Sequence, residues 1–533
     1  MGQPGACGDE GGLDPELWQH IRECPCPCDH MGYGNFLDYQ QIPPCPPRYP
    51  PAPLYARDET SFDSVLPQHY QPPRFGRTDR RHQYHDVIVR DYHPHHRAPR
   101  DLYYPSYEYD SCSCSSGSDT NRNNLRGPWC ICLVVCVVIA TLTAGLGLPL
   151  ALGPHDVGLL SPEERLELVR KLLKDTPLID GHNDLPWNLR KFLANQLNGL
   201  DLNKITSEEP WTSSRWSHTD LPRLIQGGVG AQFWSAYVPC KSQHKDAVQI
   251  TLEQIDAIRR LVHHEHQHLE MAKNVQDIRS VHKQGKIASL IGVEGGHALG
   301  NSLAVLRMFY NLGARYLTIT HSCDTAWATG QDTTTRQGLS DFGEIVVKEM
   351  NRLGMIVDLS HSSVYTAMSA INVSTAPVIF SHSASYTLCN SSRNVPDDVI
   401  KLVANKGGIV MVNFYAYHVA CSVNASMMDV IRHINHIRKV AGIEHVGIGA
   451  GYDGINVTPS GLDDVSRYPY LFAELLADPD WSEQDIRLLA GLNFLRVFQK
   501  VEEVRDQFAK LEMQPFEELG PRKEVEECIS KNS

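Results

Sequence analysis

Basic residues are in the minority in this chain, which has 49 lysines and arginines against 62 acidic residues and a net charge of −13. This balance argues against a protein that binds nucleic acid by electrostatic attraction. The sequence also has no glycine-rich phosphate loop, no internal repeat, and no serine, histidine and aspartate in the order of a hydrolase triad. It therefore offers no motif of a P-loop protein, a repeat protein or a serine hydrolase.

A lack of lysine and a lack of hydrophobic periodicity separate the first part of the chain from the rest. Over all 533 residues the composition is ordinary, with 42% apolar and 21% charged residues, which excludes a wholly disordered, collagenous or coiled-coil chain. Residues 1–128, however, contain no lysine and no sustained hydrophobic period, and they are rich in proline, tyrosine, histidine and cysteine. We predict a mostly disordered tail, because this segment buries too little apolar surface to offset its ordering entropy.

A long uncharged run follows this tail at residues 129–152. About 20 apolar residues cross the hydrocarbon layer of a membrane, so we predict a transmembrane signal-anchor helix. A cleaved signal peptide fits poorly because 128 residues precede the run, and a buried core helix fits poorly because the run is long. Arg122 and Arg126 precede it, whereas Asp156 and Glu163 follow it. The positive-inside rule then predicts a single-pass type II plasma-membrane protein with its carboxyl-terminal part outside the cell.

The predicted cytoplasmic tail carries two weaker signals. The sequence PPRY, from Pro46 to Tyr49, fits the pattern that WW domains bind, although a plain proline-rich linker explains it as well. Several cysteines near the predicted span are candidates for palmitoylation, or are simply free thiols. They are Cys112, Cys114, Cys130, Cys132 and Cys136.

Cysteines and glycosylation sequons in the predicted outer part agree with this topology. Only five of the 15 cysteines follow the span, and an odd number outside the cell predicts two internal bridges and one cysteine for a partner chain. The sequons for N-glycosylation all lie on the same side. They are at Asn372, Asn390, Asn424 and Asn456.

Short apolar runs alternate with amphipathic helical patterns through the outer part of the chain. Eight such runs occur, each followed by a helical pattern, which predicts an α/β fold: a closed (β/α)8 TIM-like barrel. An open doubly wound sheet is the alternative, although it usually has fewer strands. The runs are residues 177–184, 229–238, 288–296, 315–322, 355–361, 377–383, 408–415 and 445–454.

Polar residues gather at the carboxyl ends of these runs, where a barrel places its active site. Five of them, from four different runs, have the side chains of a zinc site. These five are His182, Asp184, Glu294, His361 and His382. Five ligands are too many for one tetrahedral catalytic zinc, so they predict two metal ions that share a bridging carboxylate.

Several segments resemble the membrane dipeptidase family, the zinc peptidases of the renal dipeptidase type with amidohydrolase-like barrels. The segments are DGHNDLPW, IASLIGVEGGH, RYLTITHSCDTAW, PVIFSHS, SRNVPDD and MVNFY. The resemblance covers about residues 160–510, and we predict a dipeptidase-like barrel over residues 160–515 and a carboxyl-terminal tail over residues 516–533. It implies hydrolysis of dipeptides or small peptide conjugates.

The resemblance also implies a role for individual residues. His182 and Asp184 would hold one zinc ion, His361 and His382 the other, and Glu294 would bridge the two. His321 matches a histidine that binds and polarises the substrate, and Arg393 matches the arginine that pairs with the substrate's terminal carboxylate. Asp358 is expected to support the site, and His297 to be structural.

The family resemblance assigns the outer cysteines as well. It pairs Cys240 with Cys323 and Cys389 with Cys421, and it suggests that Cys528 links two chains of a homodimer. Family members are commonly held by a carboxyl-terminal glycolipid, but residues 524–533 (EVEECISKNS) are not the hydrophobic segment that such an anchor requires. We therefore expect the span at residues 129–152 to be the anchor.

One strand end departs from the family pattern. The family has two aspartates in G-[GS]-D-[FY]-D-G, whereas this chain reads Gly-Ala-Gly-Tyr-Asp-Gly over residues 449–454. Gly451 thus replaces the aspartate that shuttles protons, and only Asp453 remains. On an extended strand Asp453 would point to the same side as position 451, about 6.6 Å further along. It would replace the missing acid only if the strand bends.

Two hypotheses follow from this departure. The first is an active zinc dipeptidase, slowed by the loss of a general acid–base group, with Glu294, His321 and Asp453 as catalytic residues. The second is an inactive pseudoenzyme that retains the metal ligands for folding and acts as a cell-surface binding or signalling protein.

Overall fold

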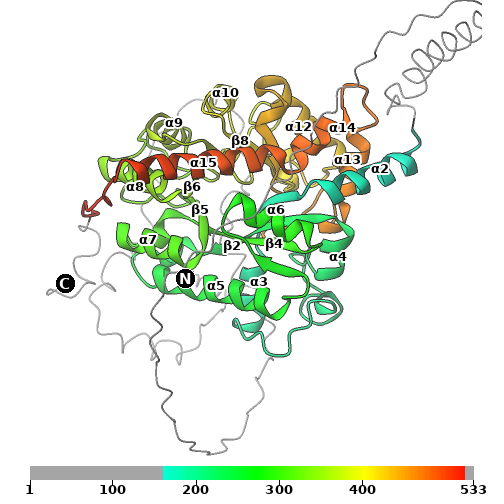
Figure 1. The fold of residues 1–533 in the computed structure, drawn as a ribbon, viewed down its shortest axis with the longest axis horizontal. Coiled ribbons are helices and arrows are strands. Elements are labelled where there is room, and N and C mark those ends of the chain that lie inside the picture. Colours follow the sequence, from blue (N-terminus) through cyan, green and yellow to red (C-terminus); the bar gives the residue numbers. More distant parts are fainter. Residues whose placement is uncertain (1–159, 522–533) are drawn as a thin grey trace, which may run out of the picture. The chain divides into compact units, whose positions relative to one another are not determined.

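The computed structural model describes residues 160–521, which form a closed barrel of parallel strands surrounded by helices (Figure 1). Hydrogen-bonded neighbours follow the order β2-β1-β9-β8-β7-β6-β5-β4, and a further pairing of β2 with β4 closes the ring. The barrel strands are β1 (Leu178–Asn183), β2 (Val229–Tyr237), β4 (Ile287–Glu294), β5 (Ala314–Thr318), β6 (Ile356–Asp358), β7 (Val378–Phe380), β8 (Ile409–Val412) and β9 (Val446–Ile448). This confirms the predicted (β/α)8 barrel and excludes the open sheet.

Each predicted apolar run overlaps one strand of the ring, and β4 and β5 begin one residue before their runs. The short strand β3 (Leu269–Met271) was not predicted; it pairs with the beginning of β4 through Leu269 and Ile287. Its sequence, Leu-Glu-Met, has no apolar run, so only the tertiary structure reveals β3.

Helices cover the outside of the barrel (Figure 1). They are α2 (Pro162–Asp175), α3 (Leu185–Leu193), α4 (Leu221–Gln226), α5 (Ala247–His264), α6 (Val275–Lys283), α7 (Leu303–Leu312), α8 (Asp341–Leu353), α9 (Val364–Val373), α10 (Asp397–Asn405), α11 (Ala416–Val419), α12 (Met427–Ala441), α13 (Tyr468–Leu475), α14 (Glu483–Arg487) and α15 (Asn493–Lys510). Short helical turns of other types lie between them.

The amino-terminal end of the barrel is closed by α15, the red helix in Figure 1. Phe494 and Phe498 of α15 share one buried hydrophobic cluster with Phe233 of β2 and Tyr316 of β5. Asn493 donates to the carbonyl of Val446, where β9 begins. Because this end is packed with apolar side chains, only the carboxyl end is left for polar chemistry.

Several predicted features lie outside residues 160–521. These are the tail, its PPRY sequence and cysteines, the predicted span at residues 129–152, and Cys528. Among the helices of the described part, none has the length and apolar character needed to cross a membrane.

Candidate metal centre

The carboxylate of Glu294, at the end of β4, lies at the centre of a histidine cluster. Its Oε1 is 3.1 Å from Nε2 of His361, 3.5 Å from Nε2 of His382 and 3.8 Å from Nε2 of His321. Its Oε2 is 3.4 Å from Nε2 of His182 and accepts a hydrogen bond of 2.9 Å from Ser235 of β2. Strands on several sides of the barrel therefore converge on one buried carboxylate.

His182, on β1, is held from both sides of its ring. Nε2 lies 3.2 Å from Oδ2 of Asp184, which follows the end of β1, and Nδ1 lies 3.0 Å from the hydroxyl of Tyr316. The ring stacks on that of His382, with centroids 3.7 Å apart. His182 and Asp184 thus meet as the sequence predicts.

The other two predicted histidine ligands face each other. Nε2 of His361 and Nε2 of His382 are 3.1 Å apart, beside the same carboxylate oxygen. Nδ1 of His382 is 2.8 Å from the hydroxyl of Ser381, which donates to Asp358. Asp358 therefore supports His382 through Ser381, whereas the buried Nδ1 of His361 has no hydrogen-bond partner among residues 160–521.

The predicted ligands differ in how burial and neighbours shift their proton affinity. Burial holds the pKa of both His361 and His382 well below the usual range. The charge of Arg393 lowers both further, and so does a neighbouring histidine: His321 for His361, and His182 for His382. Burial by itself would lower the pKa of His182, but the carboxylates of Glu294 and Asp184 raise it well above the usual range. Burial opposes ionisation of Glu294, yet its histidine partners lower its pKa. The cluster thus combines an ionised carboxylate with two neutral imidazoles, the form in which histidine binds metal.

Arg393 lies beside the cluster, in the segment between β7 and α10. It is 6% exposed and donates to the hydroxyl of Ser383 at 2.9 Å and to the carbonyl of His382 at 3.0 Å. Burial lowers its pKa to about 10, so the guanidinium stays charged at neutral pH. Arg393 and His361 line one small cleft together with Val364 and Pro396.

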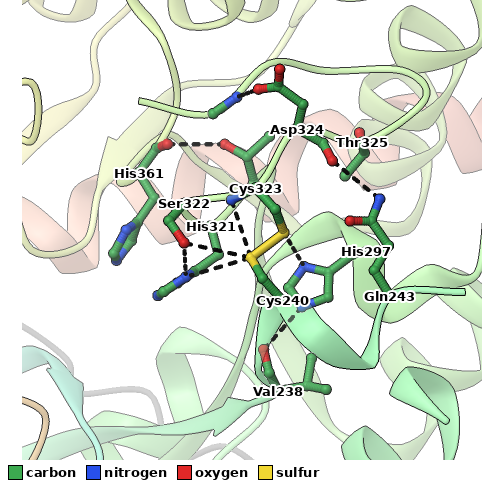
Figure 2. The surroundings of a disulfide bond; sticks show 12 residues. Val238, Cys240, Gln243, His297, His321, Ser322, Cys323, Asp324, Thr325 and His361 are labelled. Carbon is green, nitrogen blue, oxygen red and sulfur yellow. Dashed lines mark hydrogen bonds between the residues drawn. A yellow bond between two sulfur atoms is a disulfide. The ribbon is translucent and has the colours of Figure 1, made fainter. Parts of the chain in front are cut away.

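A disulfide between Cys240 and Cys323 ties the segment after β2 to the segment that carries His321 (Figure 2). The sulfur of Cys240 is 4.0 Å from Nδ1 of His321, and that of Cys323 is 3.9 Å from Nδ1 of His297. His297 also lies 2.9 Å from the carbonyl of Val238, as expected of a structural residue. The second disulfide joins Cys389 to Cys421.

The segment after β9 departs from the extended geometry assumed in the sequence analysis. The strand ends at Ile448, and both Gly451 (φ 74°) and Asp453 (φ 65°) have left-handed backbone conformations. The backbone is therefore not extended at positions 451 and 453, and the shared side expected for an extended strand does not apply there. The amide of Gly451 donates to the carbonyl of His182 at 3.1 Å, so position 451 adjoins a predicted ligand.

The carboxylate of Asp453 is bound by groups outside the predicted ligand set. Its Oδ1 accepts from the amide of His218 at 3.1 Å, and its Oδ2 accepts from the side chain of Asn188 at 3.1 Å. Burial raises the pKa of Asp453 to about 7. Through these contacts Asp453 links the segment after β9 to the segments that carry Asn188 and His218. They do not support the catalytic role predicted for Asp453.

The four sequons differ in accessibility. Asn372, Asn390 and Asn424 are exposed, whereas Asn456 is half-buried. Oδ1 of Asn456 accepts a hydrogen bond of 3.2 Å from the hydroxyl of Tyr415. Glycosylation of all four remains a prediction.

Sequence reasoning missed the groups that support the ligands, above all Ser235, Tyr316 and Ser381. A serine or tyrosine inside a strand is common, and its partner on another strand is known only once the barrel closes. The one usable signal was the alternation of side chains, because an inward-facing tyrosine needs a partner for its hydroxyl.

The barrel with a histidine–carboxylate cluster at the carboxyl ends of its strands defines the class, a metal-dependent hydrolase fold. The sequence profile of the membrane dipeptidase family (peptidase family M19) matches residues 166–512. The chain therefore belongs to the membrane dipeptidase family.

Known relatives agree with this assignment. Dipeptidase 3 of Mus musculus is 46% identical over 359 residues, which cover 66% of this chain and 70% of that protein. A solved metallopeptidase of family M19, dipeptidase AC, is 26% identical with a TM-score of 0.55 and covers 61% of this chain and 99% of its own. A metallopeptidase from Rhodobacter sphaeroides, solved with a phosphinate mimic of the dipeptide L-Ala-D-Ala, is 26% identical with a TM-score of 0.54 and covers 61% of this chain and 100% of its own.

Proposed function

We propose that this chain is a zinc-dependent dipeptidase with two metal ions per barrel. The observation that carries the proposal is the sharing of the Glu294 carboxylate, with three histidine nitrogens at its Oε1 and a fourth at its Oε2. A carboxylate with separate partners at its two oxygens is suited to bridging two cations. Membership of a dipeptidase family supports the same reaction class.

The residues fit zinc by their chemistry. Imidazole and carboxylate groups are preferred zinc ligands. Two imidazole nitrogens, those of His361 and His382, lie 3.1 Å apart, and the low pKa of both favours lone pairs over protons at these atoms. His182 and Asp184 would hold one ion, His361 and His382 the other, with Glu294 between them. Bound zinc would supply Lewis acidity and a hydroxide nucleophile at neutral pH.

The residues around the cluster would bind and orient the substrate. Arg393 is a buried cation with a planar fork of donors, which suits the terminal carboxylate of a dipeptide. Since Arg393 and His361 line the same cleft, a carboxylate bound there lies next to the predicted metal ligands. His321, whose Nε2 is 3.8 Å from Oε1 of Glu294, lies at the cluster and would polarise the scissile carbonyl, the role that the family resemblance gives it. An arginine this close to the cluster favours short substrates.

For transfer of the proton to the leaving amine, the chain has fewer suitable groups than for metal or substrate binding. Position 451 is glycine, and Asp453 is bound to His218 and Asn188. We therefore propose a slowed dipeptidase. A metal-binding pseudoenzyme is the second candidate, favoured by the same observation, because the metal ligands do not depend on position 451.

The proposal is tested with the purified full-length chain in detergent, by metal analysis and dipeptide hydrolysis on the same sample. Two zinc ions per chain, with turnover that is abolished in Glu294→Ala, would support a dipeptidase. A dipeptide with an amidated terminus serves as the matched poor substrate, because it lacks the carboxylate that Arg393 would bind. Two zinc ions without turnover of any dipeptide would favour the pseudoenzyme, and absence of bound zinc would overturn both.

We further propose that the barrel is extracellular and anchored by residues 129–152. The uncharged run and its flanking charges support this orientation. A glycosidase-sensitive mass shift of the chain expressed in cells tests it, because sequons are modified only on the outer side.

A further inference from the structure

A buried tyrosine of β5 reaches across the barrel interior to a predicted metal ligand on β1. Tyr316 is fully buried, and its ring stacks on Phe233 with centroids 4.9 Å apart. Its hydroxyl lies 3.2 Å from the carbonyl of Gly181 and 3.0 Å from Nδ1 of His182. The ring therefore connects β5 with β1, although these strands are not neighbours in the barrel.

The space for this ring exists because Gly292 of β4 has no side chain. Gly292 is the residue paired with Tyr316 across the two strands. A Cβ atom at Gly292 would lie 1.9 Å from Cζ and 2.5 Å from the hydroxyl oxygen of Tyr316. Any other residue at position 292 would displace the phenol. Glycine is therefore required because the ring of Tyr316 lies against the backbone of β4, and not because of the backbone angles at this position.

The hydrogen bonds of the Tyr316 hydroxyl assign a proton to Nδ1 of His182. The hydroxyl of Tyr316 has one hydrogen, and the carbonyl of Gly181 is a pure acceptor. When the hydroxyl donates to Gly181, its oxygen is free to accept the Nδ1–H of His182. Nε2, which lies 3.2 Å from Asp184 and 3.4 Å from Glu294, is then the ring nitrogen that faces the predicted metal site and binds the ion once its own proton is released.

We propose that Tyr316 is a positioning residue that fixes the tautomer and orientation of His182 for metal binding. This inference rests on the proposed metal site and adds a residue to it. Groups that hold the second nitrogen of a metal-binding histidine typically affect metal affinity 10- to 100-fold. The effect is confined to the ion that His182 holds, because Tyr316 lies within hydrogen-bonding distance of His182 alone among the predicted ligands of the described part.

The test is zinc affinity of the full-length chain, measured by competition with a chromogenic chelator. Tyr316→Phe removes only the hydroxyl, and we expect the dissociation constant of one zinc equivalent to rise about 10- to 100-fold while the other is unchanged. Tyr452→Phe is the matched control, since this buried tyrosine donates to the carbonyl of Leu462 and bonds no predicted ligand through its side chain. A second hydroxyl-free variant, Tyr316→Met, is made alongside in case the first does not fold.

A double-mutant cycle separates positioning from a general loosening of the core. If Tyr316 acts through His182, then adding Tyr316→Phe to His182→Ala has no further effect on zinc affinity. Unchanged affinity in the folded Tyr316 variants, or equal weakening in Tyr452→Phe, would overturn the inference while leaving the proposed function intact. A wild-type chain that binds no zinc would instead overturn the proposed function, and the inference with it.

Discussion

The ends of β4 and β9 belong to the same rim of the barrel, yet their side chains are engaged in opposite ways. At β4, Glu294 is surrounded by four histidines and a serine. After β9, Gly451 has no side chain, and Asp453 is bound by His218 and Asn188. Under the proposed function, metal binding and proton transfer would be supplied by different strands of one barrel, so one function could be weakened while the other stays complete.

The largest loss of activity and of bound metal is expected when the shared carboxylate of Glu294 is changed. Glu294→Gln keeps the shape of the side chain but removes the charge that holds the cluster together. Since a Lewis-acidic metal contributes several kcal/mol to the transition state, we expect dipeptidase activity to fall at least about a thousand-fold, with loss of bound zinc. Metal analysis and hydrolysis assays measure both.

The control for this change is Glu349→Gln. Glu349 is also buried, but it pairs with Arg307 and Arg352 on the outside of the barrel. We expect it to lower stability and leave zinc content unchanged. Equal zinc loss in both variants would contradict the special role of Glu294.

Asp453→Asn tests whether the acid after β9 is a structural tie. Burial raises its pKa to about 7 from the usual 3.8, so the folded state holds a proton that the unfolded state releases, and wild-type stability falls as pH rises between these values. At 1.36 kcal/mol per pKa unit, the variant should gain up to about 4 kcal/mol over wild type from pH 4 to pH 8.

Denaturant unfolding at both pH values measures this gain. The strain of the left-handed backbone is tolerated by asparagine, so the substitution does not introduce a new penalty there. Burial lowers the pKa of the neighbouring His218 to about 4, but this residue is present in both proteins and its contribution cancels. A stability difference that does not change with pH would contradict the predicted shift.

Gly451→Asp should restore the missing acid and make the two strand ends more alike. A Cβ at position 451 would meet only the side chain of Ile455, at 3.9 Å, so a side chain can begin there without a clash. General acid–base assistance is worth at least about 100-fold, and we expect kcat to rise by about that factor. Gly451→Ala is the control, because it has the same backbone strain and no acid. Equal kcat in both variants would remove proton transfer at this position from the mechanism.

Arg393→Ala tests substrate binding separately from metal binding and proton transfer. Loss of a charged hydrogen-bonding partner costs about 1.5–3 kcal/mol, so KM for dipeptides should rise about 10- to 100-fold with a smaller change in kcat. Steady-state kinetics measure this rise. Arg165→Ala is the control: this buried arginine bonds the carbonyls of Leu160 and Ala473, in no contact with the cluster. Unchanged KM in Arg393→Ala would exclude its role as the carboxylate anchor.

Much of the fold and of the candidate site was predictable from sequence because both follow local patterns. The eight apolar runs correspond to the eight strands of the closed ring. The ligand candidates end four of those runs, and parallel strands bring their carboxyl ends to one rim. His182, Glu294, His361 and His382 therefore had to lie near one another in any closed barrel.

The contacts across the interior could not be predicted in this way. Tyr316 reaches His182 only because the barrel closes and because Gly292 leaves room for the ring. The direction of Asp453 depended on left-handed backbone angles after β9, which no hydrophobic period encodes.

The sequence by itself thus determined the barrel class, the order of the ligand-bearing strand ends and the glycine at position 451, since each is a matter of residue type and spacing. Only the tertiary structure decided how Glu294 is shared, what holds the far side of each histidine, and where Asp453 points. The physical reason is that these features depend on distances between strands far apart in the chain, and close packing of the interior fixes those distances.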